Sequence, residues 1–256
     1  MSKPIVGVQT YTLREQMKTI PAIAKTLARV RDIGYTSVQL SGCWPQDADE
    51  LATVLKDTGL TAASTHVGWG DFTRDLDTLI ENHRAWGCLH PAIGGLPQDY
   101  FCKEGVRKFL NELTPIANRL AEAGMDFSYH NHNHELVRYG QRTWLARLFE
   151  DGSPEVVKAE IDVYWITAGG GDPAAWIRKC AGREPILHVK DMVVTPEREQ
   201  RFAPIGDGNL NWPAILEAAT ESGVEYLMVE QDDCYGEDPF DCLKRSYDFL
   251  TGMGYR

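Results

Sequence analysis

Short apolar runs alternate with longer segments of helical periodicity along the whole chain. Eight of these runs are typical of buried strands, and they lie at residues 5–9, 37–41, 61–66, 91–95, 126–131, 157–162, 186–190 and 226–230. A polar loop follows each run, and then a segment in which apolar residues recur every three or four positions. This alternation predicts a parallel sheet with helices packed outside it.

Three helical segments carry clear start and stop signals. Residues 21–33 begin with Pro21, which suits a first helical turn, and Gly34 stands where a helix end is capped. Residues 103–123 and 212–222 repeat the apolar spacing, and each is followed directly by a glycine. Eight such strand–helix units in 256 residues predict one α/β domain over residues 1–256, a single (β/α)8 TIM barrel. An open doubly wound sheet is disfavoured because no glycine-rich phosphate loop follows the first strand.

Charge narrows the range of partners. The formal net charge is −11, from 26 Lys and Arg against 37 Asp and Glu. An acidic chain repels phosphate backbones and anionic lipid surfaces, so we expect no nucleic acid and no membrane partner. We find neither a signal peptide nor an apolar run long enough to span a membrane. The six cysteines are scattered and form no CxxC pair, which favours reduced thiols and a cytoplasmic location.

The candidate chemistry lies at the carboxyl ends of the strands, where such barrels carry their active sites. Residues two apart on a strand share a face, so several ends offer two polar side chains that point the same way. These pairs are His130 with His132, Glu160 with Asp162, His188 with Lys190, and Glu230 with Asp232. The last four strands would therefore place imidazole, carboxylate, imidazole and carboxylate groups around one axis.

Mixed nitrogen and oxygen ligands of this kind suit one divalent ion such as Mn, Co, Zn or Fe. Each residue also has an ordinary structural interpretation. A histidine at a strand end often only forms hydrogen bonds, Asp162 could cap the next helix, and Lys190 with Asp191 could be an exposed pair. The convergence of four strand ends favours a metal site over four separate structural roles.

Five segments resemble motifs of the sugar phosphate isomerase/epimerase family, whose members are xylose isomerase-like barrels. The segments are YHNHNHEL (129–136), EIDVYWITAGGGDP (160–173), LHVKDM (187–192), IGDGNLNWPAIL (205–216) and MVEQD (228–232). They occur in the family's order and extend the resemblance over essentially the whole chain. The family is related to inosose dehydratase, tagatose 3-epimerase, endonuclease IV and enzymes that process 3-keto-glycosides.

The resemblance implies one divalent metal held by Glu, Asp, His and Glu from strands five to eight. It assigns Asp162, His188 and Glu230 as ligands and places His130 where the family has its first Glu. His132 shares the face of His130 and Glu135 could reach back from the loop, so the fifth-strand ligand stays open among them. Two imidazoles and two carboxylates would leave the ion a stronger Lewis acid than three carboxylates would. We favour manganese.

The function implied is an isomerase or epimerase that removes a proton next to a metal-polarised carbonyl of a keto-sugar or keto-glycoside. Glu230 could combine metal binding with proton transfer, and His132, Glu135 and Lys190 are the other acid–base candidates. His66 resembles a substrate-facing position, although a buried hydrogen-bonded histidine is an equal alternative.

Four further residues are candidates for contact with the sugar. Trp165 follows the Asp162 position and could offer an apolar face to a sugar ring, and Trp44 and Trp69 are similar candidates in earlier loops. Asp207 lies in the glycine-rich segment IGDGN and could bind a sugar hydroxyl, although a tight turn is the simpler interpretation.

Three other functions compete with the isomerase. A lyase would use the same proton abstraction and then expel a β-hydroxyl or glycosyl group. A nuclease like endonuclease IV would need three metals and a basic face, which an acidic chain does not offer. A sugar-binding barrel without activity would explain the missing first Glu. We expect a small-molecule carbohydrate as the partner, without a phosphate because few basic residues lie near the strand ends, and a homo-oligomer is consistent with barrels of this type.

Overall fold

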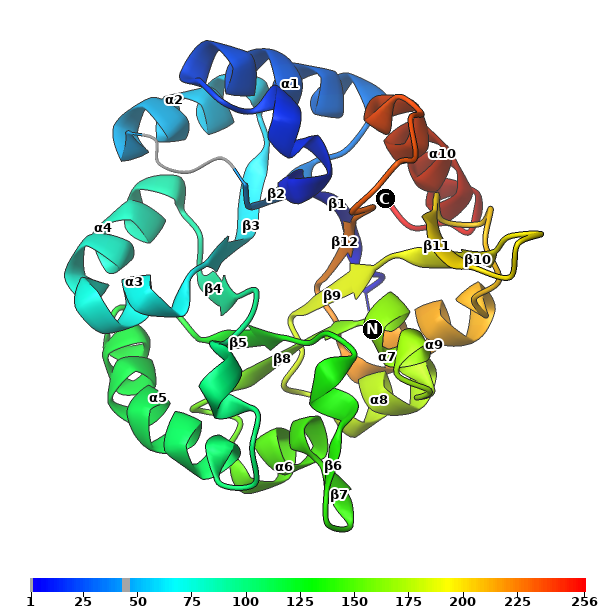
Figure 1. Cartoon of the computed structure of the whole chain (residues 1–256). Coiled ribbons are helices and arrows are strands. Elements are labelled where there is room, and N and C mark those ends of the chain that lie inside the picture. Colours follow the sequence, from blue (N-terminus) through cyan, green and yellow to red (C-terminus); the bar gives the residue numbers. More distant parts are fainter. Residues whose placement is uncertain (1, 43–46) are drawn as a thin grey trace.

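Eight parallel strands close into a barrel at the centre of the molecule, as Figure 1 shows in a view along the barrel. The structure is a computed structural model that describes residues 2–42 and 47–256. The barrel strands are β1 (Ile5–Gln9), β2 (Ser37–Leu40), β3 (Thr61–Val67), β4 (His90–Ile93), β5 (Ser128–His130), β8 (Lys158–Asp162), β9 (Ile186–Val189) and β12 (Tyr226–Val229).

The sheet closes between its first and last strands. Val8 of β1 pairs with Val38 on one side and with Val229 on the other. The complete order around the barrel is β1-β12-β9-β8-β5-β4-β3-β2. Each of the eight predicted strands is therefore present, and the predicted (β/α)8 barrel is confirmed.

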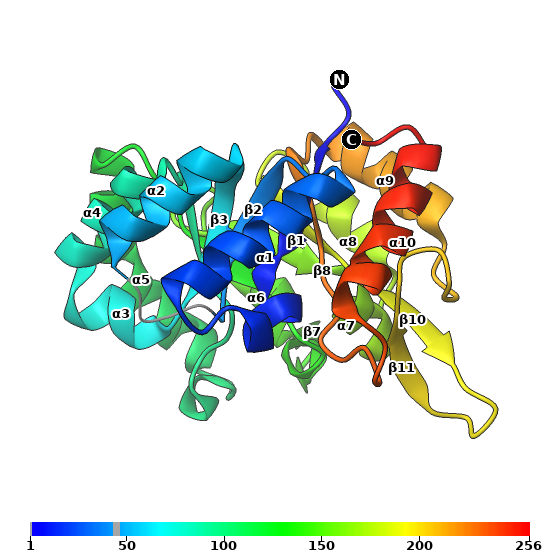
Figure 2. The ribbon, with the colours of Figure 1, turned by 90° about the horizontal axis from the view of Figure 1, so that it is seen from above.

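Helices surround the barrel and bury their apolar faces against it (Figures 1 and 2). They are α1 (Ile20–Ile33), α2 (Ala48–Thr58), α3 (Trp69–Arg74), α4 (Leu76–Trp86), α5 (Gly105–Glu122), α6 (Trp144–Asp151), α7 (Val163–Ala168), α8 (Pro173–Lys179), α9 (Trp212–Ser222) and α10 (Pro239–Gly252), with 3-10 turns η1 (Thr10–Gln16), η2 (Gln98–Tyr100) and η3 (His134–Leu136). The predicted signals mark the ends of α1: Pro21 lies in its first turn, and Gly34 ends the helix. The Thr19 hydroxyl, which was not predicted, also caps the start by accepting from the N–H of Ala22.

Two short hairpins were not predicted from the sequence. They are β6 (Arg138–Tyr139) with β7 (Arg142–Thr143), and β10 (Asp191–Val194) with β11 (Gln200–Ala203). Figure 2 shows β10 and β11 projecting at the end of the barrel opposite the two chain termini. Six of the predicted strands are shorter than expected: β2, β4, β8, β9 and β12 each by one residue and β5 by three. The strand β5 stops at His130 because the chain turns there toward η3.

The barrel interior is layered. Near the amino ends of the strands it is filled by Met228, Ile186 and Ala63, which form a small apolar cluster. Gly7 belongs to this layer, since a Cβ there would lie 2.7 Å from the Met228 Cε atom. The next layer toward the carboxyl ends is polar, with Gln9, Gln39, Ser64, Glu160 and His188 all buried. The barrel is thus apolar at one end and lined with hydrogen-bonding groups at the other.

The cysteines and the helices can be compared with the expectations of reduced thiols and no membrane span. The cysteines at 88, 102, 180, 234 and 242 are unpaired, and Cys43 lies outside the described residues. Among the described helices, none is long and apolar enough to cross a lipid bilayer.

Glu184, just before β9, is a buried carboxyl with a predictable effect on stability. It is 3% exposed; its Oε1 accepts from the N–H of Ile161 at 3.1 Å, whereas its Oε2 has no partner among the described residues. Burial raises its pKa well above the ordinary value. The native state therefore keeps a proton that the unfolded chain loses above a pH of about 4.3.

Because of this difference, the free energy of unfolding should fall as pH rises from about 4.3 to the raised pKa, by about 1.4 kcal/mol per pH unit. Glu184→Gln removes the ionisation and keeps the shape. We expect the variant to gain stability over the parent protein progressively between pH 5 and 8 in denaturant unfolding. An equal difference between the two proteins at all pH values would contradict the assignment.

Candidate active site

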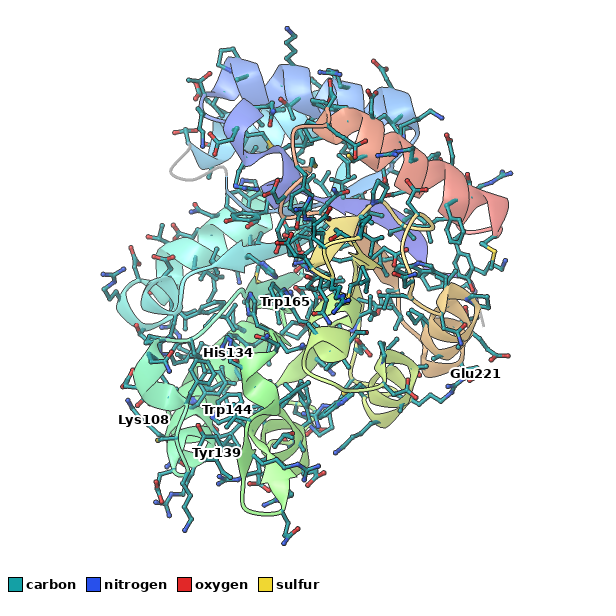
Figure 3. All side chains as sticks on the ribbon, turned by 45° about the vertical axis from the view of Figure 1, so that its right-hand side comes forward. Lys108, His134, Tyr139, Trp144, Trp165 and Glu221 are labelled. Atoms are coloured by element: carbon teal, nitrogen blue, oxygen red, sulfur yellow. The ribbon has the colours of Figure 1, made fainter. Side chains whose placement is uncertain are left out.

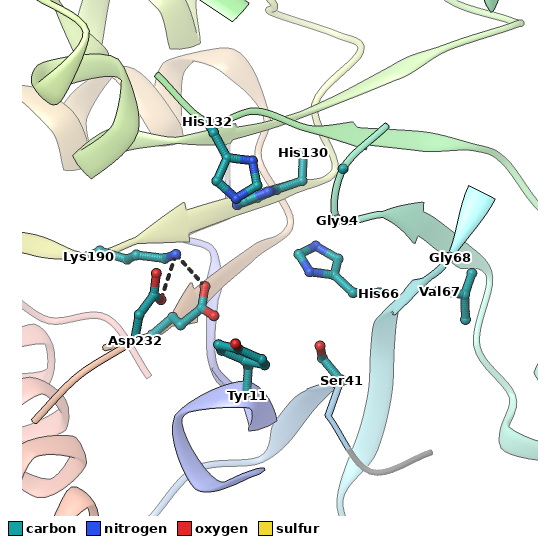
Figure 4. A pocket seen from close by; sticks show the side chains of 12 residues that line it. Tyr11, Ser41, His66, Val67, Gly68, Gly94, His130, His132, Lys190 and Asp232 are labelled. Atoms are coloured by element: carbon teal, nitrogen blue, oxygen red, sulfur yellow. Dashed lines mark hydrogen bonds and ion pairs between the residues drawn. The ribbon is translucent and has the colours of Figure 1, made fainter. Parts of the chain in front are cut away.

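A cavity of about 390 Å³ opens at the carboxyl ends of the strands (Figure 4). One wall carries the β9 and β12 side chains, and the facing wall carries side chains from β3 and β5. The lining residues are Tyr11, Ser41, His66, Val67, Gly68, Gly94, Gly95, His130, His132, Lys190, Glu230 and Asp232. The predicted gathering of titratable groups at this end of the barrel is therefore observed.

Four possible metal ligands converge at the floor of this cavity. Ligand atoms of His130, Asp162, His188 and Glu230 all lie within 4.8 Å of one another. His130 Nε2 is 3.2 Å from Asp162 Oδ2, and His188 Nδ1 is 3.0 Å from Glu230 Oε2. Two ligands held at about 2.1 Å from one ion can stand up to about 4.2 Å apart, so small side-chain rotations suffice to gather all four. The donor set and its spacing fit a divalent transition metal.

Asp162 caps a helix with one carboxylate oxygen and leaves the other free to face the candidate metal ligands. Its Oδ1 accepts from the N–H of Trp165 at 3.0 Å and caps α7, which fixes the carboxylate in place. Its Oδ2 points to the other side, toward His130 and Lys190. The helix cap therefore orients the second oxygen into the ligand cluster.

Lys190 extends from the end of β9 into the same cluster and is 2% exposed. Its Nζ lies 3.1 Å from Asp162 Oδ2, 2.8 Å from Glu230 Oε2 and 2.9 Å from Asp232 Oδ1. Burial lowers the pKa of Lys190, but these three carboxylates outweigh burial and raise it well above the ordinary value. Lys190 is therefore a charged hydrogen-bond donor in this state. Lys190 and Asp191 are both buried, so the alternative of an exposed pair is wrong.

Glu230 and Asp232 leave the end of β12 on the same side, as alternation predicts. Burial raises the pKa of Glu230, but the neighbouring Lys190 and His188 outweigh it and hold that pKa well below the ordinary value. For Asp232, burial and the Glu230 charge together raise the pKa to about 7. The Lys190 ammonium bridges these two carboxylates, and Figure 4 shows it beside Asp232. The wall thus holds one firmly ionised carboxylate and one that is easily protonated.

His132 faces the cavity from the opposite wall. Burial and the nearby Lys190 ammonium lower its pKa to about 4, so its imidazole is neutral at pH 7. Its Nδ1 has no hydrogen-bond partner among the described residues, nor does Nδ1 of His130. The two walls therefore present carboxylates on one side and a neutral imidazole with an unused nitrogen on the other.

Glu135 and His134 are placed differently from Glu230 and His132. Glu135 is buried beneath the η3 loop, where its Oε1 accepts from the Tyr129 hydroxyl and its Oε2 from the N–H of His132, each at 2.9 Å. Burial raises its pKa to about 7, yet it does not line the cavity. His132, His134 and Glu135 form another cluster of possible ligand atoms. The His132 and His134 rings stack at an angle of 14°, so the in-plane lone pairs of these two imidazoles do not meet at one point.

His66 lines the cavity, but both ring nitrogens face protein groups. Its Nε2 is 2.5 Å from Glu160 Oε1, and its Nδ1 is 3.3 Å from the Gln9 amide nitrogen. These contacts bear out the hydrogen-bonded histidine among the two interpretations offered by the sequence. The His66 ring also stacks on that of His188, at a centroid distance of 5.0 Å, and its side chain is 12% exposed.

The aromatic candidates differ in position. Trp165 follows the end of β8, and Figure 3 labels it near the middle of the molecule. Its ring lies 5.4 Å from that of His132, which lines the cavity, and its Nε1 has no partner among the described residues. Trp69 is buried in an aromatic cluster and donates to the Tyr100 hydroxyl at 3.0 Å, which is a packing role. Trp44 lies outside the described residues.

Asp207 is not brought to the cavity. Its side chain is 47% exposed and pairs with Arg245 at 3.1 Å. The glycine-rich segment around it is organised by Asp191 instead, whose buried carboxylate accepts from the N–H groups of Gly206 and Gly208. A Cβ on Gly208 would lie 2.3 Å from Asp191 Oδ1, which explains why a glycine stands there. This segment is a tight turn, the simpler of the two interpretations.

A closed (β/α)8 barrel with ionisable side chains at the carboxyl ends of its strands has the architecture of TIM-barrel enzymes. The profile of one family, described as xylose isomerase-like TIM barrel, matches residues 27–251. The chain belongs to this family, as the motifs in the sequence suggested.

Three relatives illustrate the range of the similarity. The rhizopine catabolism protein MocC of Rhizobium meliloti is 27% identical, over 90% of this chain and 81% of that protein. The inosose dehydratase of Geobacillus kaustophilus is 24% identical, over 90% of this chain and 86% of that protein. The crystal structure of a sugar phosphate isomerase/epimerase from Parabacteroides distasonis superposes with a TM-score of 0.81 at 21% identity, over 98% of this chain and 96% of that one.

Proposed function

We propose that this protein is a divalent-metal-dependent isomerase or epimerase of a keto-sugar or keto-glycoside. The observation that carries the proposal is the convergence of two carboxylate oxygens and two imidazoles from four adjacent barrel strands at the floor of one cavity. Among the described residues, Lys190 is the one Lys or Arg that lines this cavity. This concentration of acceptor atoms favours a bound cation, in keeping with the metal-dependent sugar enzymes that the motifs resemble.

His130, Asp162, His188 and Glu230 would hold the ion. Manganese is favoured over Co, Zn or Fe on the resemblance. When bound, the ion would act as a Lewis acid that withdraws electron density from a substrate carbonyl. This would lower the pKa of the neighbouring C–H group. The Lys190 ammonium stands beside the same oxygens and would add a hydrogen-bond donor for a developing negative charge.

The chain's own groups would move the proton. Glu230 is ionised and lines the cavity directly after β12. His132 is neutral and lies on the β5 wall, where Figure 4 labels it. Inversion at a carbon requires a proton to leave one face and return to the other, and two such groups on facing walls meet this requirement. Glu135 is enclosed by its own loop, so its proposed part is to hold His132 through the backbone N–H.

The charge of the cavity favours a substrate without phosphate. Asp162, Glu230 and Asp232 all neutralise the single Lys190 ammonium, so no lining Lys or Arg among the described residues is left for an anionic group. The open cavity of about 390 Å³ has room for a small sugar. Trp165 and the ring of His66 would give such a substrate apolar contact surfaces.

A lyase is the second candidate, and one observation favours it. The inosose dehydratase relative matches along 90% of this chain, and its name describes the loss of water from an inosose. The proton abstraction would be the same in both reactions. The outcome depends on whether the second group protonates carbon or a departing oxygen, so the product decides between them.

The test is exchange of substrate protons in D₂O, followed by NMR, with a panel of 3-keto-glycosides, ketohexoses and inososes. With Mn²⁺ present, we expect deuterium to enter at a carbon next to the carbonyl of at least one substrate. Removal of the metal with a chelator should abolish exchange, and Mn²⁺ should restore it. An epimer identifies an epimerase, and an unsaturated product identifies a lyase. No exchange and no product across the panel would reject both and favour a sugar-binding barrel.

A further inference from the structure

Glu160 is a buried carboxylate that neither the motifs nor the proposed chemistry assigns to a role. It lies on β8 two residues before Asp162, inside the barrel and directly below the metal-ligand cluster, and it is fully buried. Its Oε1 is 2.5 Å from His66 Nε2 and 2.9 Å from His188 Nε2. The Gln39 amide nitrogen lies 3.0 and 2.9 Å from its two oxygens.

The hydrogen positions around Glu160 follow from the donors and acceptors present. The Ser64 hydroxyl donates to the carbonyl of His90 at 2.7 Å, so it must accept from the Gln39 amide nitrogen at 2.9 Å. The same nitrogen donates to Glu160, since an ionised carboxylate only accepts. The orientation of the Gln39 amide is thereby fixed, with its oxygen on the other side.

The Gln39 oxygen then faces two nitrogens. It accepts from the Gln9 amide nitrogen at 2.8 Å and forms a short contact with His188 Nε2. His188 Nε2 therefore faces two acceptors, the Gln39 oxygen and the Glu160 carboxylate, and it must carry a hydrogen. Nδ1 also faces carboxylates, at 3.0 Å from Glu230 Oε2, and without a metal it donates to Glu230. In a neutral, metal-binding imidazole the hydrogen would stay on Nε2, and the lone pair would then be on Nδ1.

We propose that Glu160 is a positioning residue that fixes the ring and the tautomer of His188, so that Nδ1 is presented to the metal. The inference rests on the proposed metal site. Carboxylates that accept from the second nitrogen of a metal-binding histidine fix its orientation and raise its basicity, and their loss typically weakens metal binding about 10- to 100-fold.

The position of Glu160 argues against a purely structural role. A buried carboxylate is costly, and a neutral side chain of similar volume would fill the same space at lower cost. The side chains that contact its carboxylate among the described residues are two imidazoles, an amide and a hydroxyl, and none of these is a Lys or Arg. The negative charge of Glu160 faces His66 and His188. A carboxylate in this position orients a metal-binding histidine.

The test compares Glu160→Gln with Glu184→Gln. Glu184 is the matched control because it is also a buried glutamate beside β8 and β9, yet it contacts the N–H of Ile161 and not His188. Titration calorimetry with Mn²⁺ should give binding about 10- to 100-fold weaker for Glu160→Gln and unchanged for Glu184→Gln. Glu160→Asp, which keeps the acceptor, should recover part of the loss. Thermal unfolding of the metal-free variants establishes that they fold.

A second measurement needs no variant. Long-range ¹H–¹⁵N NMR of the parent protein loaded with Zn²⁺ should identify His188 with its hydrogen on Nε2 and the metal on Nδ1. Metal on Nε2, or equal Mn²⁺ affinity in the parent protein and Glu160→Gln, would overturn the role of Glu160 and leave the proposed function standing. A parent protein that binds no divalent ion would overturn both.

Discussion

His188→Gln is expected to abolish metal binding and to lower kcat/KM at least about 10³-fold. His188 is fully buried at the centre of the cluster, and its two nitrogens connect Glu230 on one side with Glu160 on the other. Loss of a bound Lewis acid withdraws several kcal/mol of transition-state stabilisation, and about 4 kcal/mol corresponds to about 10³-fold in rate. Metal content by mass spectrometry and steady-state kinetics on the substrate found by proton exchange measure the two effects.

Asp207→Asn is the control for this experiment. Asp207 has the same type of side chain as a predicted ligand and was a candidate for sugar binding, but it is exposed and paired with Arg245. We expect metal content and kcat/KM to change less than twofold. If His188→Gln retains one metal per chain and normal turnover, the ligand assignment is wrong. If Asp207→Asn reduces turnover tenfold, the site extends beyond the cavity described.

Asp191→Ala is expected to lower the free energy of unfolding by about 3 kcal/mol or more. Asp191 is fully buried, and its carboxylate accepts from five N–H groups, which are those of Met192, Gly206, Gly208, Leu210 and the Trp212 ring. Alanine leaves these donors buried without partners, and each such donor costs about 1–3 kcal/mol unless water replaces the carboxylate. Denaturant unfolding measures the change.

Asp207→Ala, in the loop that Asp191 holds, is the matched control for stability. Its ion pair is exposed to water and contributes little, so we expect a change within about 0.5 kcal/mol. A loss below 1 kcal/mol for Asp191→Ala would mean that the loop is held by other contacts. Because Asp191 is adjacent to Lys190, a parallel loss of turnover is also expected from displacement of that ammonium.

Regular alternation made the barrel and the direction of its site residues predictable from the sequence. Strand spacing located all eight barrel strands, and the two-residue period placed His130 with His132 and Glu230 with Asp232 on the inner face. These features depend on residues that are close together in the sequence, so they can be predicted from one sequence alone. The same two-residue period could have identified Glu160 and Asp232, to which the sequence analysis gave no role. Each lies two residues from a predicted metal ligand and therefore on the same face of its strand.

Other parts of the site depend on contacts between distant segments. The sequence pattern could not show whether the Glu135 side chain points into the cavity or into its own loop. Its position is decided by contacts with the Tyr129 hydroxyl and the loop backbone. Asp207 points outward because Asp191, sixteen residues earlier, occupies the inside of the turn. The hydrogen-bond chain from Gln9 through Gln39 to Glu160 joins three strands and has no local signature.

The measurement that tests the central claim most directly is an anomalous difference map of crystals grown with Mn²⁺, recorded just above the manganese absorption edge. The account predicts one peak per chain, bounded by His130, Asp162, His188 and Glu230. A peak among His132, His134 and Glu135, or no peak at saturating Mn²⁺, would contradict it.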